Sequence, residues 1–322
     1  MTDGIHRIQV PTPFAVGRVN VYLIEDDPLT LVDAGPNSGT SFDELTTGLA
    51  AVGHSLEDIE LVILTHQHID HLGLVSLVAQ RSGADVAAID VAVPFVENFR
   101  EEARKDDDFA RGVMLRNGIP EDVVSALSAV SEAFRAWGAR ADVTRVLHDG
   151  DELRLRDRTL AVHHRPGHSP SDTVFHDRER RLLIAADHLL PHISSNPLIS
   201  RPPDGSSERP QALVTYMRSL QATRAMDVDL VLPGHGDPIT DHRALIDERF
   251  ALHRRRAGKI LRLIQEQPRT AYEIAQALWG NIAVTQAYLT LSEVLGHVDL
   301  LTNDGSVAEV ERDGTSVFEA TG

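Results

Sequence analysis

The sequence predicts an α/β protein with a helical insertion and a small C-terminal module. Short aliphatic runs of strand length alternate with segments of helical periodicity from Val19 to Leu232. A charged stretch of helical period, from about Pro94 to Ala139, interrupts this rhythm. After Asp241 the pattern changes to helices followed by two short strands. We therefore predict a first domain over residues 1–242, with an insertion at about 94–140, and a second domain over residues 243–322.

The composition limits the classes of function. The chain has 322 residues, with 31 Lys and Arg against 48 Asp and Glu, and a net charge of −17 at pH 7. This charge opposes binding to phosphate backbones and anionic lipid, so we expect neither nucleic acid nor a membrane as a partner. The chain has no cysteine but 16 histidines, so a transition-metal site must use imidazole and carboxylate ligands. Without an apolar leader or a long apolar stretch, we expect a cytoplasmic protein.

The elements before the insertion follow from local patterns. They are strands at 19–24 and 29–32, a helix at 41–52, a strand at 61–64 and a helix at 72–80. Turn-forming residues between the first two strands predict a hairpin. Ser41 is the expected N-cap of the first helix, with Glu44 as its capping-box partner.

The elements after the insertion alternate less regularly. We predict strands at 142–147, 153–155, 160–163, 173–176, 181–185 and 230–232, and a helix at 212–226. The span Leu189–Pro210 is rich in Pro, Ser and Asn and predicts a long loop, and such loops beside strand ends are often functional.

The C-terminal segment has the pattern of a winged-helix module. It predicts helices at 243–266, 270–278 and 285–298, and strands at 306–310 and 316–319 around an Asp-Gly turn. Its shorter helices carry almost no basic residues, which makes them poor readers of a DNA groove. We therefore interpret the module as a packing or dimerisation element.

The strongest chemical signal lies in the turn after the 61–64 strand. His66, His68, Asp70 and His71 fall within six positions there. Residues two apart in an extended loop point the same way, so His66 and His68 can address one point. Asp70 and His71 stand where the helix begins and can turn toward a neighbouring point. Imidazole and carboxylate ligands suit Zn, and also Mn or Fe.

Three more residues of ligand type stand in turns that follow predicted strands: His168, Asp187 and His235. Five His and two Asp can satisfy two divalent metal ions, and Asp187 is central enough in the ligand order to bridge both. Two ions about 3.5–4 Å apart can hold one hydroxide between them and clamp a carbonyl or phosphoryl group. We expect two such ions as cofactors, with Zn favoured.

These motifs resemble those of the metallo-β-lactamase-fold hydrolase superfamily. Its His-x-His-x-Asp-His signature is matched by residues 66–71, and its other ligands are matched in order and context. The resemblance implies one metal held by His66, His68 and His168, a second held by Asp70, His71 and His235, and a bridging Asp187. It also implies a four-layer αββα sandwich, and that Asp33 orients the metal-binding loop.

A finer similarity is to the β-lactamase-like protein 2 branch, which has a C-terminal winged-helix tail and a helix with a His-Arg pair like His253-Arg254. That branch includes thioesterase-like and endoribonuclease members, so it leaves the substrate open. We interpret the basic run 253–256 as a solvated helix face paired with local acids rather than as a nucleic-acid contact.

The predicted function is that of a dinuclear metal hydrolase. A metal-bridging hydroxide would attack the ester-like carbonyl of a thioester, lactone or carboxylic ester, with Asp70 or a metal-bound water handling the proton. The insertion and the 189–210 loop are expected to form pocket walls for the apolar acyl part of a small-molecule substrate. The insertion would contribute Phe95, Phe99, Phe109, Met114 and Leu115. His188 and His192 are expected to contact that substrate.

Two alternatives stay open from the sequence. One is a metal-dependent endoribonuclease or phosphodiesterase that uses the same ligands. The other is a DNA-binding regulator that uses the C-terminal module for binding and the metal site as a sensor. The C-terminal module is also compatible with a homodimer.

Overall fold

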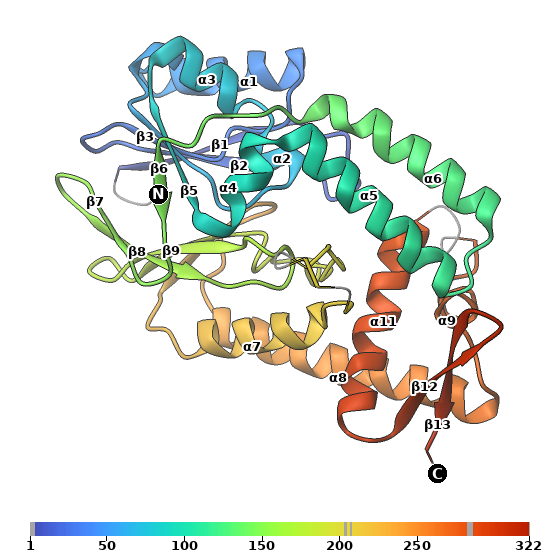
Figure 1. Ribbon diagram of the computed structural model, residues 1–322. Helices are drawn as coiled ribbons and strands as arrows, with labels where there is room; N and C mark the ends of the chain where they lie inside the picture. Colours follow the sequence, from blue (N-terminus) through green and yellow to red (C-terminus); the bar gives the residue numbers. More distant parts are fainter. Residues whose placement is uncertain (1–3, 203–204, 207, 282–285, 322) are drawn as a thin grey trace. The chain divides into compact units, whose positions relative to one another are not determined.

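The computed structural model describes residues 4–202, 205–206, 208–281 and 286–321 (Figure 1). The chain divides into two compact units: unit 1 comprises Met1–Ala103, Phe134–Ser195 and Arg224–His242, and unit 2 comprises Arg104–Ala133, Asn196–Thr223 and Arg243–Gly322. The last boundary coincides with the one expected from the sequence. Unit 2 differs from the expected second domain because it also contains residues 104–133 of the insertion and residues 196–223.

Unit 1 contains a six-stranded sheet in the order β1-β2-β3-β4-β5-β6. The strands are β1 (Ile5–Val10), β2 (Val19–Ile24), β3 (Thr30–Val32), β4 (Leu61–Ile63), β5 (Asp85–Ile89) and β6 (Arg145–Leu147). The expected hairpin is confirmed by the antiparallel register of β2 and β3, and the strands from β3 to β6 pair in parallel. β1 and β5 were not predicted. The sequence Asp-Val-Ala-Ala-Ile of β5 is short and alanine-rich, so its pattern does not separate strand from helix.

A second sheet of unit 1 has the order β11-β10-β9-β8-β7. Its strands are β7 (Glu152–Arg154), β8 (Thr159–His164), β9 (Thr173–Asp177), β10 (Leu182–Ala186) and β11 (Leu230–Pro233). Side chains from both sheets form one apolar core: Tyr22, Val32 and Ile63 from the first sheet pack with Val162, Phe175 and Ile184 from the second. The two sheets of unit 1 therefore lie face to face as a sandwich.

Helices cover the other face of the first sheet. The helical segments of unit 1 are α1 (Gly39–Ala51), α2 (Ile69–Leu72), α3 (Val75–Ser82), α4 (Val93–Glu97), the start of α5 (Phe99–Arg116) and the 3₁₀ turns Leu56–Asp58, Asp90–Ala92 and Arg135–Trp137. In Figure 1, α1 and α3 lie together on one side of the first sheet. Leu45 and Leu49 of α1 and Val78 of α3 share a core with Val62 of β4. Phe99 is buried in this core, so it does not have the expected place in a pocket wall.

The predicted N-cap of α1 is wrong by one turn. Ser38 caps the helix, because its hydroxyl accepts the backbone N–H of Ser41 at 3.1 Å. Ser41 itself is fully buried, and its hydroxyl donates to the carbonyl oxygen of Pro11 at 2.9 Å. Its side chain therefore serves a tertiary contact that a local pattern cannot reveal.

Unit 2 is mainly helical. It contains the rest of α5, α6 (Glu121–Phe134), α7 (Ala212–Arg224), α8 (His242–Glu266), α9 (Ala271–Trp279), α11 (Ala287–Asn303) and a hairpin of β12 (Val307–Arg312) and β13 (Thr315–Ala320). Met114 of α5 packs in the unit's core with Ile260, Leu291 and Phe318, so it also does not have its expected place in a pocket wall. The expected start of the third C-terminal helix at Thr285 lies outside the described residues.

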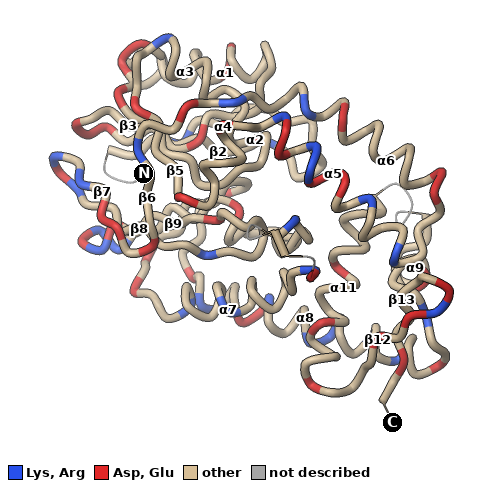
Figure 2. The backbone as a smooth tube through the Cα atoms, viewed as in Figure 1, with Lys and Arg blue, Asp and Glu red and all other residues tan. Residues whose placement is uncertain are grey.

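No helix in the described part of the chain is long and apolar enough to cross a bilayer. Basic residues stand among acidic ones (Figure 2). Many form local ion pairs, such as Arg154 with Glu152, and Arg181 with Asp227 and Asp229.

Candidate metal centre

The metal-binding loop leaves the sheet at the end of β4. β4 pairs in parallel with β3 and β5, so its carboxyl end lies at the sheet edge where loops carry functional groups. His66 follows in the loop, and His68 is the N-cap residue of the short helix α2. Asp70 and His71 lie in the first turn of that helix and are both buried. The strand–loop–helix segment thus presents four ligand-type side chains within residues 66–71.

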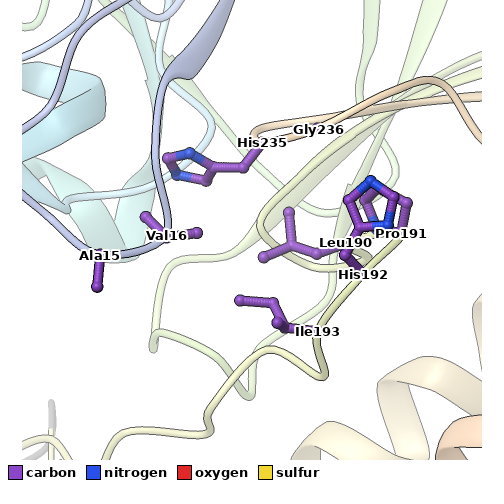
Figure 3. A pocket seen from close by; sticks show the side chains of 8 residues that line it. All are labelled: Ala15, Val16, Leu190, Pro191, His192, Ile193, His235 and Gly236. Atoms are coloured by element: carbon purple, nitrogen blue, oxygen red, sulfur yellow. The ribbon is translucent and has the colours of Figure 1, made fainter.

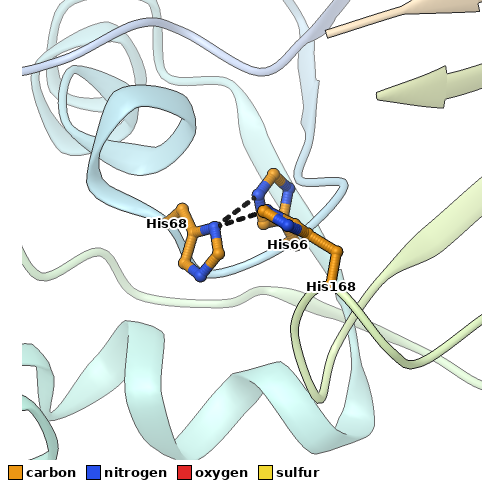
Figure 4. Close-up of side chains that lie close together, drawn as sticks. All are labelled: His66, His68 and His168. Carbon is orange, nitrogen blue, oxygen red and sulfur yellow. Dashed lines mark hydrogen bonds between the residues drawn. The ribbon is translucent and has the colours of Figure 1, made fainter. Parts of the chain in front are cut away.

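Three imidazoles form the first group. His66 Nε2 lies 3.0 Å from His68 Nδ1, and His168 Nε2 lies 2.9 Å from the same His68 atom (Figure 4). His168 comes from the turn between β8 and β9, 100 residues further along the chain. Two imidazoles on one tetrahedral zinc ion have nitrogens about 3.3 Å apart. The nitrogens of this group therefore converge as the ligands of one ion do.

The second group contains Asp70, His71 and His235, each offering a donor atom within 4.8 Å of the others. His235 Nε2 lies 3.4 Å from Asp70 Oδ2. His235 follows β11, so this group joins the metal-binding loop to the second sheet. Asp70 is the carboxylate of a set with two imidazoles, a combination that also suits zinc.

Asp187, which follows β10, contacts both groups. Its Oδ1 lies 3.4 Å from His71 Nε2. Its Oδ2 lies 3.5 Å from His168 Nε2 and 3.6 Å from His235 Nε2. The carboxylate therefore stands between the two triads, where a bridging ligand is required. The structure thus brings together all seven residues that the sequence singled out as metal ligands.

Hydrogen bonds hold the imidazoles in the tautomer that a metal requires. Thr65 Oγ1 donates to Asp33 and faces His66 Nδ1 at 3.0 Å, so it accepts the proton of that nitrogen. His71 Nδ1 donates to Asp33 Oδ2 at 2.8 Å, and His235 Nδ1 donates to the carbonyl oxygen of Arg18 at 2.8 Å. In each case Nδ1 is already engaged, so Nε2 is the nitrogen left for a metal, and it points into the cluster.

Three buried polar atoms of the cluster have no hydrogen-bond partner among the described residues: His71 Nε2, Asp187 Oδ1 and His235 Nε2. Such atoms cost about 1–3 kcal/mol each when nothing compensates them. All three atoms face the same small space, and each can bind a metal ion once it carries no proton. A pair of cations would satisfy them, so the donor set fits the metal ions that the sequence predicts.

Electrostatics favour the ligand forms of His66, His68, Asp70 and Asp187. Burial lowers the pKa of His66 well below its ordinary value, and it lowers the pKa of His68 to about 3. Burial would raise the pKa of Asp187, but the charges of His235 and His71 outweigh it, and the pKa falls well below its usual range. Burial also opposes ionisation of Asp70, but His71 and His235 keep its pKa low. The carboxylates are therefore ionised, and His66 and His68 are neutral. Burial alone would lower the pKa of His71 and His235, but Asp187 and the other nearby carboxylates raise it, so a metal ion would take the place of a proton on these two rings.

Asp33 contacts both the metal-binding loop and His71. Besides His71, it accepts the backbone N–H of Thr65 at 2.9 Å and the Thr65 hydroxyl at 2.8 Å. Its backbone has φ of 60°, a left-handed conformation that Asp tolerates better than most residues. Asp33 therefore ties the end of β3 to the metal-binding loop.

Other positioning residues were not predicted from the sequence. Asn20 and Tyr22 donate to the carbonyl oxygen of Pro233 at 2.9 and 2.7 Å, which holds the turn before His235. Asp172 accepts the backbone N–H of Ser169 at 2.9 Å and its hydroxyl at 2.6 Å, beside His168. Neither Tyr22 nor Asp172 has a local sequence signal, because the partner of Tyr22 is distant in the chain and the partner of Asp172 lies inside a turn.

Gly234 lies against the centre for a steric reason. A β-carbon at this position would overlap with Asp187 Oδ1 and lie 3.0 Å from His71 Cε1. Its Pro-Gly-His context was the sequence signal for His235, but the need for glycine comes from the tertiary approach of Asp187.

A cavity of about 340 Å³ lies beside the centre (Figure 3). It is lined by Ala15, Val16, Leu190, Pro191, His192, Ile193, His235 and Gly236. His192, one of the two expected substrate contacts, is in this lining. His188 is not: it is 1% exposed, and burial lowers its pKa to about 3. The cavity connects a metal-ligand residue, His235, with an apolar wall.

Comparisons with known proteins agree with this geometry. Residues 15–235 match the model of the metallo-β-lactamase superfamily. The chain is 35% identical over 319 residues to a probable metallo-hydrolase, YqjP, of Bacillus subtilis (strain 168), covering 99% of this chain and 98% of that protein. It is 29% identical over 191 residues to the human acyl-coenzyme A thioesterase MBLAC2, covering 58% of this chain and 63% of that protein.

The structure is also similar to a solved structure. A metallo-β-lactamase family protein from Thermus thermophilus aligns with a TM-score of 0.81 and 26% identity over 98% of both chains. The predicted α/β fold class is thereby confirmed. The sandwich of two sheets, the convergent His and Asp side chains and the match over residues 15–235 lead to one conclusion: the chain belongs to the metallo-β-lactamase superfamily and is a metallo-hydrolase of that fold.

Proposed function

We propose that this protein is a dinuclear metal hydrolase that cleaves an ester-like carbonyl of a small molecule, with a thioester as the first substrate class. The position of Asp187 supports this proposal most directly. Its two oxygens approach His71 on one side and His168 and His235 on the other, at 3.4–3.6 Å. A carboxylate in that place serves two ions rather than one.

The ligand assignment follows the two triads. His66, His68 and His168 would hold the first ion, Asp70, His71 and His235 the second, and Asp187 both. Two divalent cations bound there, zinc in the first instance and Mn or Fe as alternatives, would supply Lewis-acid activation of water and of the scissile carbonyl. The donor set contains no thiolate, and its mixture of imidazole and carboxylate accepts each of these metals.

Asp70 is the candidate group for proton transfer. Its carboxylate is ionised and lies 3.4 Å from His235 Nε2. It can hold the proton of the attacking water and deliver it to the departing thiolate or alkoxide. A departing thiolate needs less protonation than an alkoxide because its conjugate acid has a far lower pKa. Hydrolysis of a thioester therefore depends less on proton transfer from Asp70 than hydrolysis of a carboxylic ester does.

The cavity favours an apolar acyl group. Val16, Leu190 and Ile193 contribute aliphatic side chains, and His235 connects this wall to the metal centre. Apolar lining with a few polar groups at one end is the usual character of a small-molecule site. In this placement the acyl chain would lie against the aliphatic wall, with its carbonyl toward the His and Asp cluster and His192 at its side.

Two further observations favour a thioester over a nucleic acid. The relative that shares 29% identity over 58% of this chain is an acyl-coenzyme A thioesterase. A net charge of −17, with basic residues interspersed among acidic ones (Figure 2), opposes binding of a polyanionic strand. Endoribonuclease activity is therefore the less favoured alternative, and the experiment below includes RNA as a substrate to test it.

The C-terminal segment has a subordinate role in this proposal. α9, α11 and the β12–β13 hairpin follow the order of a winged-helix module, and the hairpin turns at Asp313 and Gly314 with φ of 50° and 77°. We interpret it as a winged-helix-like element for packing or for association with a second copy of the chain, rather than for binding DNA.

A substrate panel tests the proposed function. Protein loaded with Zn²⁺ or Mn²⁺ is assayed on acyl-coenzyme A thioesters, lactones, simple esters and single-stranded RNA, alongside Asp187→Asn and the control Asp43→Asn, whose side chain is exposed on α1. We expect thioester hydrolysis that falls at least 100-fold in Asp187→Asn, with loss of bound metal, and that is unchanged in Asp43→Asn. RNA cleavage without any hydrolysis of esters or thioesters would overturn the proposal.

A further inference from the structure

A second cluster of ligand-type side chains lies in unit 2, apart from the residues of the candidate metal centre. It consists of His253 from α8 and of Glu293 and His297 from α11. One donor atom from each residue lies within 4.8 Å of the other two. Both imidazoles have no exposed surface, which contradicts the interpretation of residue 253 as part of a solvated helix face. The neighbouring Arg254 and Arg255 are exposed, as that interpretation requires.

The two imidazoles face each other through ring nitrogens. His297 Nδ1 lies 2.6 Å from the carbonyl oxygen of Glu293, to which it donates its proton. His297 Nε2 therefore keeps its lone pair, and it lies 3.2 Å from His253 Nδ1. This separation is close to the distance of about 3.3 Å between two imidazole nitrogens on one tetrahedral zinc ion. A hydrogen bond from one ring nitrogen to the backbone is also the usual device that orients a metal-binding histidine.

The carboxylate completes a ligand set. Glu293 and His297 are four residues apart on one helix, so their side chains lie on the same face. The guanidinium of Arg256 pairs with Glu293 and lies 5.6 Å from the ring centroid of Trp279. It thereby holds the carboxylate in one orientation, as outer partners of ligating carboxylates do. Two histidines and one glutamate form an established zinc donor set.

The imidazoles are also in the protonation state that a ligand needs. Burial is the main cause that lowers the pKa of His253 to about 4, and it lowers the pKa of His297 as well. Both rings are neutral at neutral pH. A cation therefore meets no charged ring, and it binds His253 Nδ1 once the proton of that nitrogen has moved to Nε2 of the same ring.

We propose that His253, Glu293 and His297 form a separate transition-metal site, for Zn²⁺ or a similar divalent ion, that ties α8 to α11 within unit 2. The ion would replace a hydrogen bond between two rings by bonds to three side chains from two helices. Its expected effect is on the stability of unit 2, since no residue of the candidate metal centre belongs to this cluster. The proposal does not depend on the proposed hydrolytic function.

Metal stoichiometry of the full-length chain tests this site. The wild type, His297→Gln and the control His148→Gln, whose imidazole is 62% exposed, are saturated with Co²⁺ and desalted, and metal is counted by elemental analysis. We expect His297→Gln to hold one equivalent fewer than the wild type and His148→Gln to hold the same amount as the wild type. Equal metal content in the wild type and His297→Gln would show that the two rings share only a hydrogen bond, and would overturn the proposal.

A second comparison removes the dependence on a single variant. In the double variant Asp187→Asn with His66→Gln, which disables the centre of unit 1, we expect one equivalent of Co²⁺ to remain with the visible absorption of a four-coordinate ion. Adding Zn²⁺ should raise the Tm of this double variant, and it should not do so once His297→Gln is added. A double variant that binds no metal and shows no Zn²⁺ effect on Tm contradicts the site, whatever the folding of the single variant.

Discussion

Single atoms decide how the metal-ligand side chains are held. Asp33 uses both carboxylate oxygens, one for the backbone N–H of Thr65 and one for the Thr65 hydroxyl and the His71 ring. Because His71 Nδ1 donates a hydrogen bond to Asp33, the ring turns its other nitrogen, Nε2, toward Asp187 Oδ1 at 3.4 Å. The geometry of the candidate centre therefore depends on residues that do not themselves contact a metal.

Gly234 offers a test of this dependence. A methyl group at this position would overlap with Asp187 Oδ1, and Asp187 has little freedom to move because it stands between the two triads. We expect Gly234→Ala to lower metal affinity at least tenfold, within the range found for changes to the partners of metal ligands, and to lower hydrolysis in parallel. Bound metal is measured by competition with a chromophoric chelator.

The matched control is Gly112→Ala on α5, where an added β-carbon has no neighbour within 4 Å. Replacing a helical glycine there should leave metal affinity unchanged and stabilise the helix slightly. Wild-type affinity in Gly234→Ala would contradict the steric role.

At the scale of secondary-structure elements, turns that join strands also make tertiary contacts with one another, which their sequences do not indicate. Asp26, in the turn between β2 and β3, accepts the Arg158 guanidinium at 3.1 Å and the backbone N–H of Asp157 at 2.9 Å, both from the turn between β7 and β8. The side chains of Asp26 and Arg158 are 0% and 4% exposed. This ion pair joins the edges of the two sheets of unit 1.

We expect Asp26→Asn to lower the free energy of unfolding by about 3–5 kcal/mol, because it leaves a buried guanidinium without its main partner. Burial raises the pKa of Asp26, but the N–H groups of Asp157 and Asp27 and the Arg158 charge outweigh it and lower that pKa below 3.8. The difference in unfolding free energy between the wild type and Asp26→Asn should therefore be complete above pH 3.8. It should disappear as the pH falls through the lower pKa that Asp26 has in the folded protein.

Urea unfolding at several pH values measures this difference. The control is Asp27→Asn, whose side chain is 64% exposed and whose pair with Arg156 should contribute little. A difference between Asp26→Asn and the wild type that persists unchanged at pH 2 would contradict the assignment.

At the scale of the whole molecule, the candidate centre connects loops that lie far apart in the chain. Residues 66–71, 168, 187 and 235 follow β4, β8, β10 and β11 of two different sheets. Asp33, Asp70 and Asp187 concentrate negative charge among these loops, and cations would neutralise it. Metal binding should therefore stabilise the fold of unit 1 as a whole.

We expect chelation to lower the Tm and metal addition to restore it. Each ion at a free concentration of 100 times its Kd would contribute about 2.7 kcal/mol, which corresponds to a shift of about 5–10 °C per ion for a unit of this size. Differential scanning calorimetry in the His297→Gln background isolates the effect of the centre in unit 1. An unchanged Tm after complete metal removal would contradict a stabilising role.

The sequence determined the ligand-bearing turns, because each has a local signal: a strand-length apolar run followed by His or Asp in a tight turn. His66, His168, Asp187 and His235 were found in this way, and the structure brings them together. It also determined most strands, such as β2 and β10, since their β-branched and aliphatic runs are unambiguous.

The tertiary structure alone decided what surrounds those turns. The sequence predicted Ser41 as a helix cap, but its buried hydroxyl donates to the carbonyl oxygen of Pro11. The sequence predicted Phe99 and Met114 in pocket walls, but they pack in two separate cores. The pairing of Asp26 with Arg158 and of His253 with His297 joins residues 132 and 44 positions apart. Local sequence patterns reflect the conformational preferences of neighbouring residues. These contacts depend instead on which distant surfaces pack together and exclude water, and only the folded chain brings those surfaces together.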